Sequence, residues 1–502
     1  MKYKNIKLIV IAAMALTAFN SCSNDFIEVA PIASTADVNY YKNETEAYSG
    51  LIAVYDIMKK ESGGFENMIA MLNAGSDDFY AGGGSASDGA GIQSFSNYTI
   101  NPASLPDSFW FDFYQGVFRA NVMLQKLPGV NMDETTKARF TAEVRMLRAY
   151  YYFQLVTMFR NIPLIIEPIP TAQIYQITQA NPDDVYAFIE AELQAAIPNL
   201  PTTIANATEA GRVSQGAAKS LLGKVYLSQG KNSQAATTLA EVNGTPGGAN
   251  PYGYALLSNF ADLWKVDNKF HSESIWEATH TFKSNAGWGN WGSGSDEGNS
   301  LNVMIGPRGY SASSSAAPQY ETGWSFNPMT NDLYNQLVGD PRFNATVADL
   351  TALVASGQAS YSPGYMDTGH FLKKFMPTHA DLTTGGGDAV LNYRQNTYVI
   401  RLADTYLMEA EALGGTGARA QALLDAVRAR VGLPSIPVTK DAVMNERRLE
   451  LAGEGHRWHD LIRTGQAAAK LASRNFVAGK NEIWPIPLNQ LTNTKLEQNP
   501  NY

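Results

Sequence analysis

Apolar residues recur along much of the chain with the period of an α-helix. In the segment 45–60 they fall at i, i+4, i+7, i+8 and i+11, which puts Ala47, Leu51, Val54, Tyr55 and Met58 on one face. The same period runs through residues 109–127, 134–158 and 183–197. Prolines at 163 and 198 follow the last two segments, and proline cannot continue a helix. We therefore expect a series of helices that each bury one face.

Residues 217–242 have the spacing of a tetratricopeptide helix pair. Leu222-Gly223 is followed by Tyr226, and a second helix then carries Ala235, Ala236 and Leu239. Small residues in this pattern let two antiparallel helices approach closely, and the tyrosine fills the remaining gap. A weaker copy begins at residues 402–406 and continues into a helix at 418–431. Two recognisable pairs are fewer than a regular solenoid needs.

These patterns predict a mainly α fold, an irregular tetratricopeptide-like helical superhelix. We expect a single domain over residues 38–502, with the helical scaffold at about 38–243 and 396–480 and a closing C-terminal segment at 481–502. Between the two scaffold parts, residues 244–395 are rich in Gly, Ser, Asn and aromatic residues and show weak periodicity. Long loops of this kind in a compact fold usually carry function. This insertion is therefore predicted to hold the ligand site.

Tryptophans are concentrated in that insertion. Trp276, Trp288, Trp291 and Trp324 are four of the eight in the chain and fall within 49 residues. The glycine-rich run 287–309 cannot bury its rings as a regular helix would, so some aromatic surface is expected to face solvent. Alternatively, the rings fill a second hydrophobic core beneath the loops.

Exposed aromatic rings and neighbouring polar groups are what a sugar site requires. The axial C–H faces of pyranose rings pack on flat apolar rings, while amide, carboxylate and guanidinium groups bond the hydroxyls. The candidate ligand residues in the insertion are Trp288, Asn290, Trp291, Arg308, Tyr310, Tyr320 and Trp324.

The N-terminus has the features of a secretory signal. Lys2, Lys4 and Lys7 precede an apolar run from residue 8 to 19, which is too short to span a membrane. The run ends at Ser21 and Cys22, and Cys22 is the only cysteine. The segment 19–22 resembles a bacterial lipobox, in which the cysteine is lipidated. We expect a signal peptide at 1–21 and a tether at 22–37, the alternative being an ordinary signal peptide with a chance cysteine.

The charge of the chain argues against nucleic acid as a partner. The formal net charge is −9, and the three lysines of the first 21 residues have no acidic counterpart there, so the remainder carries −12. Nucleic-acid binding needs a basic footprint that this chain lacks. The glycine triplets at 82–84 and 385–387 match no phosphate-binding motif and are expected to be loops.

Characteristic motifs occur along residues 22–502, among them the helix 401–412, the run from Glu446 to Arg463 and Trp484-Pro485-Ile486-Pro487. They resemble motifs of the SusD/RagB family of Bacteroidetes nutrient-binding lipoproteins. The C-terminal third carries the strongest matches, above all the helix 401–412 and the run from Glu446 to Arg463. The matching segments include Asp25-Phe26-Ile27-Glu28, Arg119-Ala120-Asn121, Arg148-Ala149-Tyr150-Tyr151-Tyr152-Phe153, Ile162-Pro163-Leu164, Gly339-Asp340-Pro341-Arg342, Glu446-Arg447-Arg448-Leu449-Glu450-Leu451, Trp484-Pro485-Ile486-Pro487 and Gln498-Asn499-Pro500-Asn501-Tyr502.

The resemblance implies a lipid-anchored protein of the outer membrane that faces the cell exterior. Its implied function is to capture a nutrient, usually an oligosaccharide, and deliver it to a SusC-like TonB-dependent transporter. The alternative is a transporter lid for peptides or other nutrients with little sugar affinity of its own. The family also places part of its site after the first helical hairpin, which adds Asp78 and Tyr80 as candidates. Otherwise, this segment is a helix cap and a loop.

The sequence favours neither catalysis nor a cofactor. His456 and His459 lie beside Glu454 and Asp460, but three or four converging metal ligands are not evident. Adjacent acids such as Asp77 and Asp78 do not have the separation that a glycosidase pair requires and are usually solvated. The charged residues at 446–450, with Arg457 and Asp460, are expected to form structural ion pairs on helices. We therefore predict no catalytic residue, no metal and no cofactor.

Overall fold

The computed structural model describes residues 41–502, so Cys22, the signal peptide and the tether lie outside it. Helices dominate, as predicted. In the first half they are α2 (Glu44–Tyr55), α3 (Met68–Ala74), α4 (Ala90–Ser96), α5 (Ser108–Lys126), α6 (Glu134–Phe159), α7 (Thr171–Ile174), α8 (Pro182–Ala196), α9 (Asn206–Glu209), α10 (Gln215–Ser228) and α11 (Asn232–Asn243). The C-terminal part adds α16 (Leu402–Ala412), α17 (Gly417–Arg430), α18 (Lys440–Glu450), α19 (Arg457–Arg463), α20 (Ala467–Lys470) and α21 (Leu488–Leu491).

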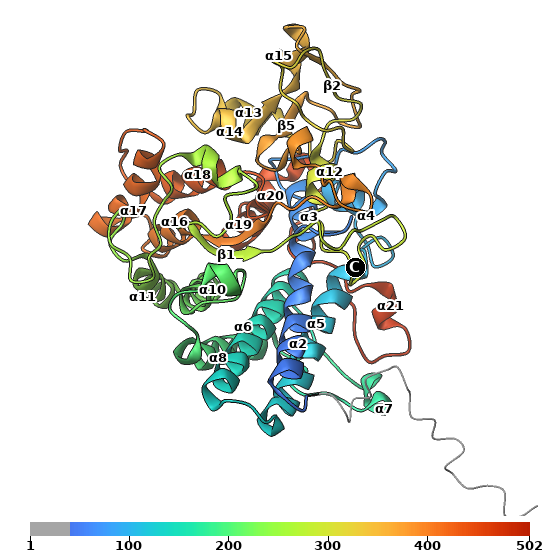
Figure 1. Cartoon of the computed structure of the whole chain (residues 1–502), viewed down its shortest axis with the longest axis vertical. Coiled ribbons are helices and arrows are strands. Elements are labelled where there is room, and N and C mark those ends of the chain that lie inside the picture. The colour runs from blue at the N-terminus through green and yellow to red at the C-terminus, as the bar shows by residue number, and fades with distance from the viewer. Residues whose placement is uncertain (1–40) are drawn as a thin grey trace, which may run out of the picture.

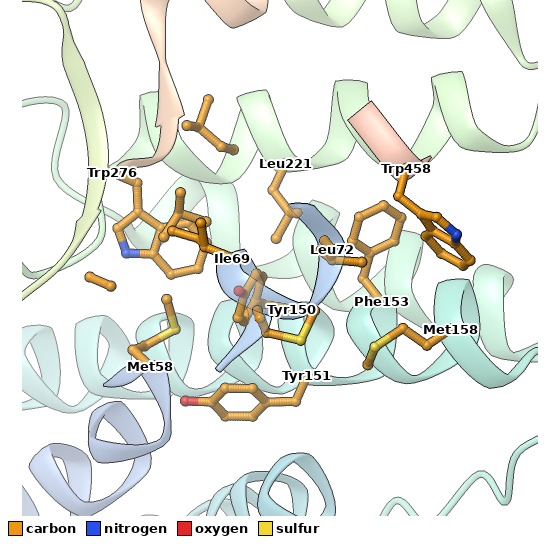
Figure 2. Close-up of a cluster of buried hydrophobic side chains, with 14 of the residues drawn as sticks. Met58, Ile69, Leu72, Tyr150, Tyr151, Phe153, Met158, Leu221, Trp276 and Trp458 are labelled. Atoms are coloured by element: carbon orange, nitrogen blue, oxygen red, sulfur yellow. The ribbon is translucent and has the colours of Figure 1, made fainter. Parts of the chain in front are cut away.

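The helix α6 is the centre of the scaffold. Asp133 caps the first turn of α6 by accepting a hydrogen bond from the backbone N–H of Thr136. The helix ends at Phe159, before Ile162-Pro163. Sixteen of its 26 residues are buried, because α5 and α8 pack along it. Its inward side chains meet those of α3, α10 and the C-terminal part in a shared core that includes Tyr150, Phe153 and Trp458 (Figure 2).

The two expected tetratricopeptide-like pairs are α10 with α11 and α16 with α17. A Cβ atom on Gly223 would lie 2.5 Å from Leu239 Cγ, so glycine is what allows α10 and α11 to approach this closely. The hydroxyl of Tyr226 accepts a hydrogen bond from Gln194 and thereby links α10 to α8. The helix α11 also packs on α16, which joins the two pairs. The prediction of a mainly α, tetratricopeptide-like fold is confirmed.

The insertion contains only short elements, and those of residues 311–372 form the end of the molecule drawn in yellow and orange in Figure 1. Its helices are α12 (Leu301–Ile305), α13 (Asn331–Leu337), α14 (Phe343–Thr346) and α15 (Leu350–Ala355). Three antiparallel strand pairs hold it together: β1 (Ser274–Ala278) with β6 (Thr397–Arg401), β2 (Ser311–Ala312) with β4 (Ala359–Ser360), and β3 (Val347–Asp349) with β5 (His370–Leu372). The β1–β6 pair aligns Ser274 with Arg401 and anchors the insertion on the C-terminal helices.

Trp276 belongs to the core and not to the exposed aromatic surface. It lies on β1, is 2% exposed, and meets the ring of Tyr150 edge to face at 4.9 Å (Figure 2). Within residues 41–502, no helix is both long and apolar enough to cross a membrane.

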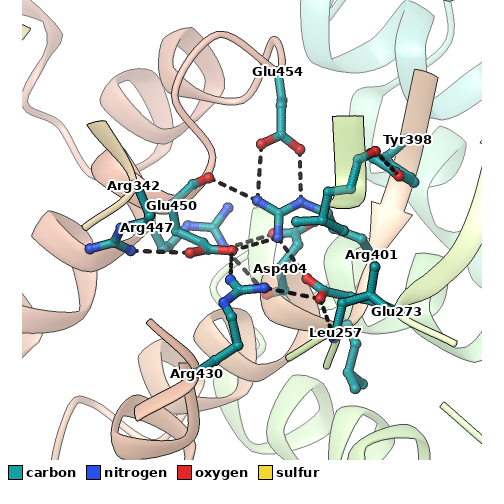
Figure 3. Close-up of polar contacts among 12 residues, drawn as sticks. Leu257, Glu273, Arg342, Tyr398, Arg401, Asp404, Arg430, Arg447, Glu450 and Glu454 are labelled. Atoms are coloured by element: carbon teal, nitrogen blue, oxygen red, sulfur yellow. Dashed lines mark hydrogen bonds and ion pairs between the residues drawn. The ribbon is translucent and has the colours of Figure 1, made fainter. Parts of the chain in front are cut away.

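A buried ion-pair network joins the insertion to the C-terminal helices (Figure 3). Arg401 is fully buried and pairs with Glu450 at 2.6 Å, Glu454 at 2.8 Å and Glu273 at 3.0 Å. Glu450 also pairs with Arg342 and Arg430. The prediction that the charged residues at 446–450, with Arg457 and Asp460, form structural ion pairs is confirmed by the contacts Arg342–Glu446, Arg447–Asp460, Arg448–Asp78 and Arg457–Asp77.

Candidate functional site

Three tryptophans of the insertion meet at the surface, and we call this cluster the tryptophan platform. Its members are Trp288, Trp291 and Trp324. The ring centroids of Trp288 and Trp324 are 6.1 Å apart with planes inclined by 31°. Trp291 stands edgewise to both, at 5.8 Å and 74° from Trp288 and at 5.4 Å and 79° from Trp324. The sequence placed these residues only in one long insertion, and the fold brings their rings into contact.

The platform combines exposure with support. Trp288 is 56% exposed, which is unusual for so large an apolar ring, whereas Trp291 and Trp324 are half-buried. Beneath them lies Phe65, which contacts Trp291 and Trp324 and meets Phe326 edge to face at 5.2 Å. The expectation that some aromatic surface faces solvent is confirmed for Trp288. The alternative, a second buried core, does not describe this ring.

Hydrogen bonds within the loop and to Asp388 fix the segment that carries Trp288 and Trp291. The side-chain oxygen of Asn290 accepts from the backbone N–H of Gly287 at 2.8 Å, and Asp296 accepts from the N–H groups of Gly292 and Gly298. The indole N–H of Trp291 donates to Ser300 at 2.9 Å. The backbone N–H of Trp288 donates to Asp388. The rings are therefore held in place before any ligand arrives.

Trp324 is held by a backbone ladder between the segments 303–309 and 322–326. Its N–H donates to the carbonyl of Val303, and the N–H of Gly323 donates to that of Pro307. Arg308 extends this support, because its Nε donates to the carbonyl of Trp324 at 3.0 Å and its guanidinium pairs with Asp88 at 2.8 Å. About a third of the Arg308 side chain is exposed, so a positive group lies beside the platform.

Tyr310 and Tyr320 form a separate pair at the end of the same ladder. Their centroids are 5.4 Å apart, and the hydroxyl of Tyr310 donates to the carbonyl of Pro318. Burial and the neighbouring Tyr310 raise the pKa of Tyr320 to about 12, so its hydroxyl stays protonated at neutral pH. No ring contact joins this pair to the tryptophans within the described residues. Whether the two tyrosines touch ligand stays a prediction.

Asp78 does not have the position expected of a ligand residue. Its side chain is 1% exposed and pairs with Arg448 at 2.6 Å, while its neighbour Asp77 pairs with Arg457. Burial raises the pKa of Asp78, and attraction to Arg448 only partly offsets this. Adjacent acids are usually solvated, but Asp77 and Asp78 are not. Their ion pairs instead bind α18 and α19 to the segment after α3. We assign Asp78 to the scaffold.

Tyr80 lines a different cavity from the platform. That cavity has a volume of about 630 Å³ and is bounded by Asp77, Asp332, Lys470 and Arg474, and no tryptophan lines it. The guanidinium of Arg474 lies 4.8 Å from the centroid of the Tyr80 ring. Of the two candidates from this segment, only Tyr80 stays a prediction.

The two histidines considered as metal ligands are half-buried and lie near cations. Burial, together with nearby Lys224, lowers the pKa of His456 to about 4 and that of His459 to about 3. Both are therefore neutral at physiological pH. In residues 41–502, no group of three or more His, Cys, Asp or Glu side chains has the arrangement of a metal site.

Phe65 is the site residue that sequence reasoning missed. It follows Gly63-Gly64 after the 3₁₀ helix η4 (Asp56–Glu61), far from the tryptophans in sequence. Ser300 Oγ accepts from both the backbone N–H of Gly64 and the indole of Trp291, so one hydroxyl joins the two segments. The sequence contains no local signal of this contact.

Both halves of the chain match models of the same group of proteins. A family model described as "SusD family" matches residues 267–502, and one described as "Starch-binding associating with outer membrane" matches residues 50–227. SusD-like protein P25 of Formosa agariphila is 26% identical and covers 93% of this chain and 90% of its own length.

Two solved structures are similar over nearly the whole chain. A "Laminarin binding SusD-like protein" is 64% identical, with a TM-score of 0.91, and the match covers 92% of this chain and all of that one. Surface glycan-binding protein A from Bacteroides thetaiotaomicron, solved in complex with laminarihexaose, is 26% identical, with a TM-score of 0.81 over 91% of this chain and all of that one. The chain belongs to the SusD family.

Proposed function

We propose that this protein captures an oligosaccharide of the β-1,3-glucan type on the tryptophan platform. The observation that carries the proposal is the solvent-facing cluster of Trp288, Trp291 and Trp324, supported from below by Phe65. An exposed apolar surface built from rigid rings is costly in water unless a ligand covers it. Pyranose rings of β-glucans have flat C–H faces that can cover it.

The shape of the platform favours a chain that turns over one that runs straight. The planes of Trp288 and Trp324 differ by 31°, and Trp291 is close to perpendicular to both. A β-1,3-linked glucan curves along its length, whereas a β-1,4-linked glucan is nearly straight and suits coplanar rings. The 64% identity to a laminarin-binding protein supports the same ligand class, because laminarin is a β-1,3-glucan.

Polar groups beside the platform would bond the sugar hydroxyls. The candidates are Arg308, whose guanidinium is partly exposed, and Asn290, whose amide nitrogen lies 3.3 Å from the Ser295 hydroxyl. No nucleophile or acid–base pair is part of this proposal, so the bound glycan is held and not cleaved.

Isothermal titration calorimetry tests the proposal. We expect saturable binding of laminarihexaose to the full mature chain, and at least tenfold weaker binding of cellohexaose and maltohexaose. Equal binding of the three hexasaccharides would contradict the β-1,3 assignment. If none of the three hexasaccharides binds, glycan capture is contradicted and a transporter lid without sugar affinity is favoured.

We further propose that Cys22 anchors the protein by lipid to the outer membrane, facing outward beside a SusC-like TonB-dependent transporter that receives the glycan. The support is the lipobox-like segment and the family's description as associating with the outer membrane. Two or more acyl chains suffice for stable anchoring.

Replacing Cys22 with Ser removes the lipidated thiol. We expect the variant to leave the membrane fraction while its affinity for laminarihexaose is unchanged, since residue 22 is far in sequence from every residue proposed to bind the glycan. Fractionation of cells and titration of the released protein measure the two effects. Retention of the variant on the membrane would contradict a lipid anchor at this position.

A further inference from the structure

A second cavity adjoins the tryptophan platform on the side of Trp291. Its volume is about 340 Å³, and its walls come from η4, the segment around Phe65, the helix α5 and the loop 291–296. Trp291 and Phe65 line it, but Trp288 and Trp324 do not. Trp291 stands edgewise to the other two rings. A group that enters this cavity would therefore point away from the axis of a sugar chain that lies on the platform. We call it the α5 pocket.

The walls of the α5 pocket offer hydrogen-bonding groups that the protein itself does not use. The side-chain amide of Gln115 has no hydrogen-bond partner among the residues that the structure describes. Asp112 pairs with Lys60 at 3.0 Å through Oδ2, and its Oδ1 likewise has no partner within residues 41–502. An amide and a carboxylate oxygen suit the donor and acceptor pattern of sugar hydroxyls.

The charge of the α5 pocket argues for a neutral ligand. Four carboxylates and two lysines line it, and each lysine has an acidic partner, Lys59 with Asp56 and Lys60 with Asp112. The net charge is negative, so a sulfated or uronic acid group would be repelled. A neutral, hydroxyl-rich ring is the ligand chemistry that fits.

The pocket and the platform are mechanically joined. Lys59 Nζ donates to the carbonyl of Ser293 at 2.7 Å, in the loop that carries the tryptophans. Trp291 belongs to both surfaces, so a ligand that occupies both would contact one continuous wall.

Resting on the proposed function, we infer that the α5 pocket is a branch subsite, which receives a single neutral sugar attached as a side branch to a glucan lying on the platform. In a β-1,3-glucan such a branch is a β-1,6-linked glucose. Gln115 bonds its hydroxyls and Trp291 separates it from the main chain. The subsite makes the protein select branched over linear chains.

Calorimetry with two heptasaccharides tests the inference. One is laminarihexaose bearing one β-1,6-linked glucose, and the other is linear laminariheptaose, which has the same number of sugars. The wild type is expected to bind the branched ligand about three- to tenfold more tightly, the effect of one or two added hydrogen bonds. Gln115→Leu should abolish this preference and leave linear binding unchanged. Gln125→Leu, at an exposed position of the same helix outside the pocket, should keep the preference.

Equal affinity of the wild type for the two heptasaccharides overturns the branch subsite and leaves the proposed function standing. Gln115→Leu weakening both ligands alike also overturns it. Binding of neither ligand overturns both the branch subsite and the proposed capture of a β-1,3-glucan.

Discussion

Replacing Arg401 with Met is expected to lower the free energy of unfolding by about 3–5 kcal/mol, as loss of one member of a buried ion-pair set does. Arg401 is completely buried and donates five hydrogen bonds, to Glu273, to the side chain and carbonyl of Glu450, and twice to Glu454 (Figure 3). Met has similar length but no donor, so three carboxylates lose a cation together. Denaturant unfolding followed by circular dichroism measures the change.

The loss of unfolding free energy in Arg401→Met should be smaller at acidic pH than at neutral pH. Burial alone would raise the pKa of Glu454, but attraction to Arg401 and Lys374 outweighs it and holds the pKa below its usual value of 4.5. A carboxylate with a depressed pKa contributes stability above pH 4.5 that disappears as the pH falls. The variant lacks this contribution. The difference in unfolding free energy between variant and wild type is therefore largest at neutral pH and shrinks as the pH falls toward and below 4.5.

A surface ion pair supplies the control. Glu134 pairs with Lys137 on α6, but its side chain is 83% exposed. Glu134→Gln should produce no measurable change, since exposed pairs contribute little. If Arg401→Met lowers the free energy of unfolding no more than Glu134→Gln does, the Arg401 ion-pair network is not what joins β6 to α18.

The scaffold could be predicted from sequence because its cause is local. The helical period depends on spacings of three and four residues, and the Gly223–Leu239 contact joins residues only 16 apart. The helices α2, α5, α6 and α8 begin and end within a few residues of their predicted bounds. The one notable difference is at the end of α2, where residues 56–61 continue as the 3₁₀ helix η4.

The site could be predicted only in part, because its contacts are distant in sequence. Asp78 resembled a loop acid, and its burial depends on Arg448, which follows it by 370 residues. Phe65 lies under the platform for the same kind of reason, since its partners Trp291 and Trp324 belong to the insertion. The clustering of tryptophans within one insertion was informative because glycine-rich loops leave large rings few ways to be buried.

Asn290 and Arg308 illustrate a further limit. Their proximity to the tryptophans was visible in the sequence, yet the structure gives both a supporting contact. Asn290 holds the turn at Gly287, and Arg308 bonds the backbone of Trp324. A polar residue next to an aromatic one can therefore orient the ring as well as bond a ligand, and spacing alone does not separate these roles.

Replacing Trp288 and Trp324 together with Ala is expected to weaken laminarihexaose binding by at least 100-fold. These two rings have the most nearly parallel planes of the platform, 31° apart, and in the proposed function they would provide the main stacking surface for the sugar chain. Truncation of a central aromatic contact typically costs about 2 kcal/mol or more, which corresponds to roughly 30-fold in Kd. The two losses are not fully additive, because the rings touch each other. Calorimetry measures the affinity.

The double substitution should lower the free energy of unfolding by only about 1–2 kcal/mol, because Trp288 is 56% exposed and only the half-buried ring of Trp324 packs on the core. Tyr175→Ala is the matched control, since Tyr175 is 53% exposed and, among residues 41–502, makes no ring contact with the three tryptophans. This control should bind laminarihexaose like the wild type. An affinity of the double variant within threefold of the wild type would place the glycan elsewhere on the molecule, with the cavity beside Tyr80 as the next surface to probe. A large loss of binding by a variant that still unfolds in a cooperative transition would support direct contact between the sugar and the two tryptophans.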